Sequence, residues 1–122
     1  MKKIIILSVW VMVMMMPHGG NGEGFGVNAQ KVYPRIITPN GDGWNDLFWV
    51  FYENPMDSEV HGKIYDIDGA EVTDMVHKSG AEEYSLCWDG TDGSKRVVPA
   101  GVYIYQITAE GSVYNGTIIV AR

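Results

Sequence analysis

The sequence is poor in the residues that cross-link chains and in those that bind polyanions. Cys87 is the single cysteine among 122 residues, which excludes an internal disulfide and a thiolate metal cluster. In the strand-like run between Leu86 and Trp88 we expect Cys87 to pack as a small apolar side chain, with a reactive or intermolecular thiol as the alternative. Lys and Arg number 9 against 15 Asp and Glu, and a net charge of -6 argues against binding to nucleic acid or anionic lipid.

Signs of catalysis are also scarce. The 3 histidines, His18, His61 and His77, are scattered along the chain, and no Gly-x-Ser-x-Gly nucleophile elbow is present. The pair Glu82–Glu83 is more simply a solvated turn than the acid and base of a glycosidase. No segment has a sustained helical period, so no phosphate loop between a strand and a helix is predicted. We therefore expect that the protein is not an enzyme and requires no cofactor.

The N-terminus has the pattern of an export signal. Lys2 and Lys3 precede an apolar run at residues 4–16. This run is short for a membrane-spanning helix, which needs about 20 residues, but it suits a signal peptide. No cysteine lies close behind the run, which excludes lipoprotein processing. A retained anchor or an assembly strand is the alternative interpretation of this segment.

A Gly-rich stretch at residues 18–26 follows and is expected to be flexible. Two regions are candidates for the cleavage site. Residues 20–22 lie at the usual distance from the apolar run, whereas residues 27–29 match the small-residue pattern of cleavage sites better but lie further away. The predicted organisation is a signal peptide with a Gly-rich linker at residues 1–29, followed by one domain at residues 30–122.

The rest of the chain has a β pattern, in which runs rich in Val, Ile, Tyr, Phe and Trp alternate with turn signals. Asp68–Gly69 is a two-residue hairpin signal, and residues 101–110 alternate cleanly between two faces. This spacing predicts an all-β, antiparallel two-sheet sandwich of about seven strands. The predicted strands are residues 32–37, 47–53, 59–67, 70–76, 84–89, 101–110 and 113–120.

Within this region five motifs occur, which are ITPNGDGWND at 37–46, KIYDIDGAEV at 63–72, WDGTDG at 88–93, VPAGVYIY at 98–105 and GTIIVAR at 116–122. In this order they resemble the gliding motility-associated C-terminal domain and its relative, the immunoglobulin-like domain of the flagellar hook-capping protein. The resemblance covers residues 32–122 and implies an immunoglobulin-like β-sandwich. It also implies a recognition module, often a sorting signal for the type IX secretion system with retention at the cell surface, whereas the hook-capping relatives are assembly scaffolds.

In that family the module usually ends a much larger secreted protein, whereas here we expect no passenger domain between signal peptide and module. The leading hypothesis is therefore a non-catalytic, exported structural or interaction module, secreted or at the cell surface, in a filament or matrix. Its expected partner is another copy or another cell-surface protein, and it meets the membrane only through an uncleaved N-terminus. Exposed edge strands at residues 32–37 or 113–122 make strand association available. The alternatives are a calcium-stiffened module that binds polysaccharide and a type IX sorting domain without cargo.

The loop at residues 40–46 is dense in oxygen-bearing side chains and glycines, like the start of a calcium loop. Its candidate calcium ligands are Asn40, Asp42, Asn45 and Asp46. It lacks the downstream Glu of an EF-hand, and the alternative is a rigid Asx-type turn without metal. Asp89 and Asp92 are candidates to complete a metal site if the two loops meet.

Aromatic side chains are the candidate contact residues. We expect Trp88 to fill the core, and one of Tyr103 and Tyr105 to point inward while the other is exposed beside Tyr114. Alternation cannot bury every aromatic residue between 44 and 52 on one face, so some are expected at an interface. The predicted interaction residues are Trp44, Trp49, Tyr105 and Tyr114.

Overall fold

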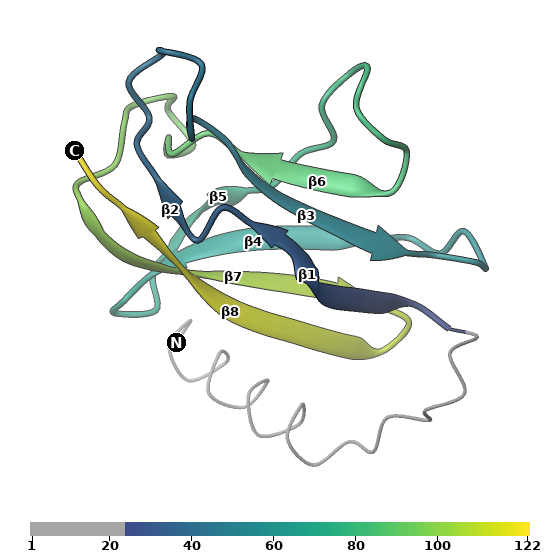
Figure 1. The fold of residues 1–122 in the computed structure, drawn as a ribbon. Coiled ribbons are helices and arrows are strands. Elements are labelled where there is room, and N and C mark those ends of the chain that lie inside the picture. Colours follow the sequence, from purple (N-terminus) through teal and green to yellow (C-terminus); the bar gives the residue numbers. More distant parts are fainter. Residues whose placement is uncertain (1–23) are drawn as a thin grey trace.

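The computed structural model describes residues 24–122, which form a two-layer β-sandwich (Figure 1). The strands are β1 (Gly26–Tyr33), β2 (Ile36–Ile37), β3 (Phe48–Glu53), β4 (His61–Asp66), β5 (Glu71–Asp74), β6 (Ser85–Trp88), β7 (Gly101–Ala109) and β8 (Ser112–Val120). This confirms the predicted immunoglobulin-like, all-β sandwich. The predicted signal peptide lies outside the described residues. Within residues 24–122 no helix has the length and hydropathy to span a bilayer.

One sheet has the strand order β1-β3-β6 and the other the order β2-β8-β7-β4-β5. All neighbours are antiparallel except β2 and β8, which are parallel. The single strand predicted at residues 32–37 is wrong in one respect, because the chain changes sheets within it. The change follows the cis peptide bond between Tyr33 and Pro34, and Pro34 has no N–H to continue the first ladder.

The core lies between the sheets and is filled by alternate residues of each strand. Phe48, Ile64 and Ile118, from three different strands, are completely buried. Trp88 fills the core as predicted, and its ring centroid lies 5.5 Å from that of Tyr103. The expectation that one of Tyr103 and Tyr105 is exposed is wrong, since both are buried. They are two residues apart, and such residues point to the same face of a strand.

The packed domain begins earlier than predicted. Phe25 is buried against Tyr52 and Tyr114, with ring centroids 5.2 and 5.7 Å away, and β1 starts at Gly26. The domain was predicted to start at residue 30, after a flexible stretch that ends at residue 26. In the structure the packed domain starts at Phe25 instead. A single phenylalanine between glycines has no alternation from which a strand could be predicted.

Candidate functional site

The sequence motifs gather at one end of the sandwich, which we call the motif end and define as residues 38–46, 66–70, 89–100 and 121–122. Figure 1 shows the β2–β3 loop beside the β6–β7 loop, near the C-terminus. The two loops touch, because a Cβ atom on Gly90 would lie 2.8 Å from Pro39 Cγ. Arg122 Nη2 donates to the carbonyl oxygen of Val98 at 2.7 Å, which ties the C-terminus to the β6–β7 loop. The β4–β5 turn joins this end because Asp66 is opposite Tyr103, near the start of β7.

Asp46 holds the β2–β3 loop together. Its Oδ1 accepts the N–H groups of Asn40 and Gly41 at 3.1 and 3.0 Å, and its Oδ2 accepts that of Gly43 at 2.7 Å. Gly41 and Gly43 have φ angles of 79° and 86°, which glycine adopts without strain. The hydrogen bond from Gly43 is the main reason that the pKa of Asp46 lies below its usual value. The loop is therefore rigidly held by a charged carboxylate.

The same construction recurs in the other turns of the motif end. Asp66 Oδ1 accepts the N–H groups of Asp68 and Ala70 at 2.9 and 2.8 Å. Asp92 Oδ1 accepts those of Ser94 and Arg96 at 2.8 and 3.1 Å. These two bonds, with that from Arg96 the stronger cause, lower the pKa of Asp92. The aspartates of the motifs thus shape their own loops.

The predicted calcium ligands take part in this hydrogen bonding of the loop. Asn40 Oδ1 accepts the N–H of Asp42 at 3.0 Å, and Asp42 Oδ1 accepts that of Trp44 at 2.8 Å. The carbonyl oxygen of Asn45 accepts the N–H of Thr38 at 2.8 Å. This is the arrangement of the alternative, a rigid Asx-type turn.

The later loop does not complete a metal site either. Asp89 Oδ1 accepts the N–H of Thr91 at 3.1 Å, so Asp89, like Asp92, is engaged in its own loop. Within residues 24–122, no three of the His, Cys, Asp and Glu side chains are grouped so that they would hold a metal ion. The carboxylates of both loops thus accept N–H groups of their own backbone, which favours the Asx-type turn over the predicted calcium site.

The four predicted interaction residues are not brought together. Trp44 is 77 % exposed in the β2–β3 loop. Trp49 lies half-buried on β3, where its ring stacks on that of Phe51 at 5.7 Å. Tyr105 is a correction, because it is buried with its ring centroid 5.2 Å from that of Phe48. Tyr114 is half-buried and donates to the carbonyl oxygen of Phe25 at 3.3 Å, away from the motif end.

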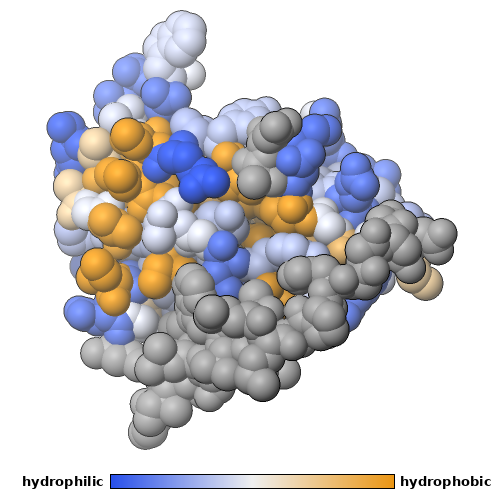
Figure 2. Space-filling view, turned by 60° about the horizontal axis from the view of Figure 1, so that its bottom comes forward, coloured by the Kyte–Doolittle hydropathy of each residue, from blue (hydrophilic) through white to orange (hydrophobic). Residues whose placement is uncertain are grey.

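An exposed apolar row, which sequence reasoning missed, borders the motif end. It consists of Ile36, Ile119 and Val102, which are direct neighbours across β2, β8 and β7. Their exposed fractions are 49, 42 and 40 %. Figure 2 shows apolar side chains gathered on the outer face of the five-stranded sheet. Only the register between strands distant in the sequence reveals this row, since each residue alone is an ordinary strand residue.

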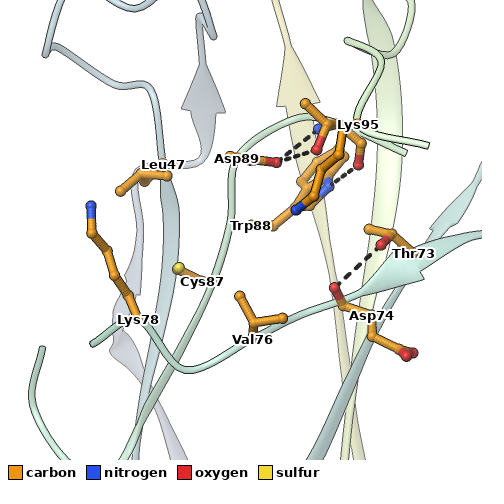
Figure 3. Close-up of a pocket in the computed structure, with 10 residues that line it drawn as sticks. Leu47, Thr73, Asp74, Val76, Lys78, Cys87, Trp88, Asp89 and Lys95 are labelled. Carbon is orange, nitrogen blue, oxygen red and sulfur yellow. Dashed lines mark hydrogen bonds between the residues drawn. The ribbon is translucent and has the colours of Figure 1, made fainter. Parts of the chain in front are cut away.

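A pocket of about 260 Å³ lies where β5 and β6 approach each other (Figure 3). Val76 and Cys87 are part of its wall and exchange backbone hydrogen bonds of 3.1 and 2.8 Å. Burial raises the pKa of the Cys87 thiol, which disfavours the thiolate, as expected for a packed rather than a reactive cysteine. Lys78 and Lys95 also line the pocket, together with polar and apolar side chains. No catalytic arrangement is visible in this part of the chain.

Comparisons with known proteins identify the family of the domain. The family model of the CHU_C type IX secretion signal domain matches residues 31–120. A search of curated proteins found no match. Among solved structures, dimeric latent PorU from Porphyromonas gingivalis superposes with a TM-score of 0.54 at 20% identity. The match covers 87% of this chain but 10% of that one, so at this identity it shows the fold alone.

CopC from Methylosinus trichosporium OB3b is more distant, with a TM-score of 0.41, 15% identity, and coverage of 62% of this chain and 72% of that one. The family match is the decisive result, because it spans the sandwich from β1 to the end of β8. The chain belongs to the CHU_C type IX secretion signal domain family.

Proposed function

We propose that this domain is an export signal read by a type IX secretion machinery, and that the motif end is the surface that is read. The observation that carries the proposal is that motifs far apart in the sequence lie together in the fold. The family model covers residues 31–120, and the motifs within it all reach the same end of the sandwich. The sorting interpretation is thereby better supported than a filament or matrix subunit. A protein with such a signal is exported, either into the medium or to the cell surface.

The motif end has the properties of a preorganised recognition surface. Asp46 fixes the β2–β3 loop, so little conformational entropy is lost when a partner binds it. Trp44 is exposed on this loop, and tryptophan is among the residues that contribute most to binding energy at interfaces. The apolar row of Ile36, Ile119 and Val102 extends this surface onto the five-stranded sheet. The expected partner is therefore a protein of the machinery with an apolar recess that accepts Trp44.

The test is export of a reporter protein fused in front of residues 24–122, with a cleavable signal peptide for the inner membrane. It is expressed in a bacterium with a type IX system and in a strain whose system is deleted. We expect the reporter outside the cell only when the system is present. Export that is equal in both strains would overturn the proposal.

A matched pair of variants then tests the motif end. Trp44→Ala removes an exposed side chain from the motif end, and we expect reporter export to fall at least about tenfold. Met56→Ala is the control, since Met56 is 70 % exposed in the β3–β4 loop, whose Ser58 bonds to Glu110 at the opposite end. Equal export of the two variants would exclude Trp44 from recognition.

A further inference from the structure

The edges of the two sheets differ in how they are protected against pairing with another strand. Unpaired N–H and C=O groups on an edge strand are a template for association, and proteins block them with bulges, charges, proline or short strands. In the three-stranded sheet, the pairing of β1 is interrupted between Val27 and Val32, and β1 ends before Pro34. On the other side, Cys87 of β6 is capped by its two hydrogen bonds with Val76. Both edges of this sheet are therefore blocked.

The β5 edge of the five-stranded sheet is protected as well. β5 has 4 residues, begins and ends with the charged Glu71 and Asp74, and pairs irregularly with β4. Lys63 Nζ bridges these two carboxylates at 3.1 and 2.7 Å. A foreign strand would have to approach this short edge past both charges.

The edge of β8 has none of these devices. Its 9 residues, SVYNGTIIV, include no charged residue and no proline, and its register with β7 is uninterrupted from Ser112 to Val120. β2 covers only the C-terminal end, where it pairs with Ile119 and Val120, as Figure 1 shows. Among the residues that the structure describes, the remainder of this edge has no backbone partner from another strand.

The direction of the free groups follows from the hydrogen bond at Ile119. Its N–H donates outward, to the carbonyl oxygen of Arg35 at 2.8 Å. Backbone groups alternate between the two sides of a strand, so those of Val113, Asn115 and Thr117 face the same outer edge. The free edge therefore has three outward residues centred on Asn115.

We propose that this edge pairs with the same edge of a second copy, antiparallel and with Asn115 opposite Asn115. β2 sets this register, because it already occupies the outward groups of Ile119. Val113 then faces Thr117 of the other copy, and the three outward residues of each chain form six backbone hydrogen bonds. The result is one continuous sheet across the two copies.

The charges along the paired edges are compatible with a second copy as the occupant. The net charge of the chain is -6, yet β8 itself carries no charge, so pairing places no like charges opposite each other along the strand. The free edge has Glu110 beyond its N-terminal end and Arg35, next to β2, at its C-terminal end. Antiparallel pairing brings the Glu110 end of one copy to the Arg35 end of the other. This self-association goes beyond the export function proposed above and does not depend on it.

The experiment uses the exported protein recovered from the cells that produce it. Sedimentation over a range of concentrations should show a monomer–dimer equilibrium. Thr117→Pro removes one outward N–H from each copy, which leaves the β7–β8 ladder intact and should raise the dimer dissociation constant at least about tenfold. Thr117→Ala, which keeps the N–H group, is the matched control and should dimerise like the native chain. Circular dichroism checks that each variant is folded.

Cysteine cross-linking tests the register in a Cys87→Ser background. A mixture of the Val113→Cys and Thr117→Cys chains should give a disulfide-linked heterodimer on mild oxidation. Thr117→Cys alone should not, because equivalent positions then lie about four residues apart along the paired strands, roughly 14 Å. A monomer at all concentrations, a dimer indifferent to Thr117→Pro, or cross-linking of Thr117→Cys to itself would each overturn the proposal.

Discussion

Gly116 of β8 lies directly opposite Tyr105 of β7, and the Tyr105 ring fills the space that a side chain at Gly116 would need. A Cβ atom at Gly116 would come within 2.4 Å of Tyr105 Cε2. Because the ring is packed against Phe48, it cannot move without disturbing the core. We predict that Gly116→Ala lowers the free energy of unfolding by about 2 kcal/mol, measured by urea denaturation.

Gly26→Ala is the control for this substitution. Gly26 also lies in a strand, but a Cβ atom there would meet nothing within 4 Å. Its free energy of unfolding should change by less than about 0.5 kcal/mol. Equal stability of the two variants would contradict the packing described for Tyr105.

Phe25 joins the N-terminal end of the domain to the core. It packs on Tyr52 and Tyr114, and its N–H donates to Glu110 Oε1 at 3.1 Å. We predict that Phe25→Ala lowers the free energy of unfolding by about 3 kcal/mol, because a buried aromatic ring is lost. Lys31 is exposed on β1, the strand that follows Phe25, and Lys31→Ala should change the free energy of unfolding little.

The position of Phe25 also leads to a prediction about the two candidate cleavage regions. Cleavage at residues 20–22 leaves Phe25 in the mature chain, whereas cleavage at residues 27–29 removes it together with the start of β1. We therefore expect the intact mass of the exported protein to place its N-terminus before Phe25. A mass that corresponds to a chain beginning at Gln30 would mean that the core forms without Phe25.

Acidity should destabilise the domain through three carboxylates. Hydrogen bonds lower the pKa of Asp46, chiefly from Gly43, of Asp92, chiefly from Arg96, and of Glu110, chiefly from the Ser58 hydroxyl. Between each lowered pKa and the usual value near pH 4, the unfolded chain binds more protons than the folded one, so stability there rises with pH.

The contribution of these groups is thus complete above about pH 5 and is lost as the pH falls below about 4. Thermal unfolding at a series of pH values measures it. Asp46→Asn should make the fall of the unfolding temperature with pH shallower. An unfolding temperature of the native chain that does not change between pH 5 and 3 would refute the role given to these three carboxylates.

Calcium should have little effect on the domain. An ion in the β2–β3 loop would have to displace N–H groups from Asp46 and Asn40, whose oxygens already accept them. We expect the unfolding temperature to be the same in millimolar calcium and in chelator. A rise in calcium that Asp42→Asn abolishes would instead establish the predicted metal site.

The sequence alone was sufficient for the sandwich because alternation and turn chemistry are local properties. The β4–β5 hairpin follows from Asp68–Gly69, and the burial of Trp88 from its place in an apolar strand. The change of sheet at Pro34 and the packing of Phe25 depend on contacts with residues far along the chain, which no local pattern records.

The candidate site shows the same division. The oxygen-rich loop was found from its residue types, but whether its carboxylates face a metal or their own backbone depends on their orientation. The exposed edge of β8 was one of two candidate strands, and only the observed sheet order distinguishes it from the strand at residues 32–37, which divides between both sheets. The inward direction of both Tyr103 and Tyr105 was available from their spacing of two and was missed.

The hydrogen bond between Phe25 and Glu110 also gives the domain a polarity. Phe25 is held where β7 ends, whereas the motif loops lie where β7 begins, and a strand of 9 residues is about 30 Å long. Anything joined to the front of this domain is therefore tethered at the far pole from the loops. A protein fused before Phe25, whatever its size, is therefore attached at the end of the sandwich opposite the motif loops and leaves those loops accessible.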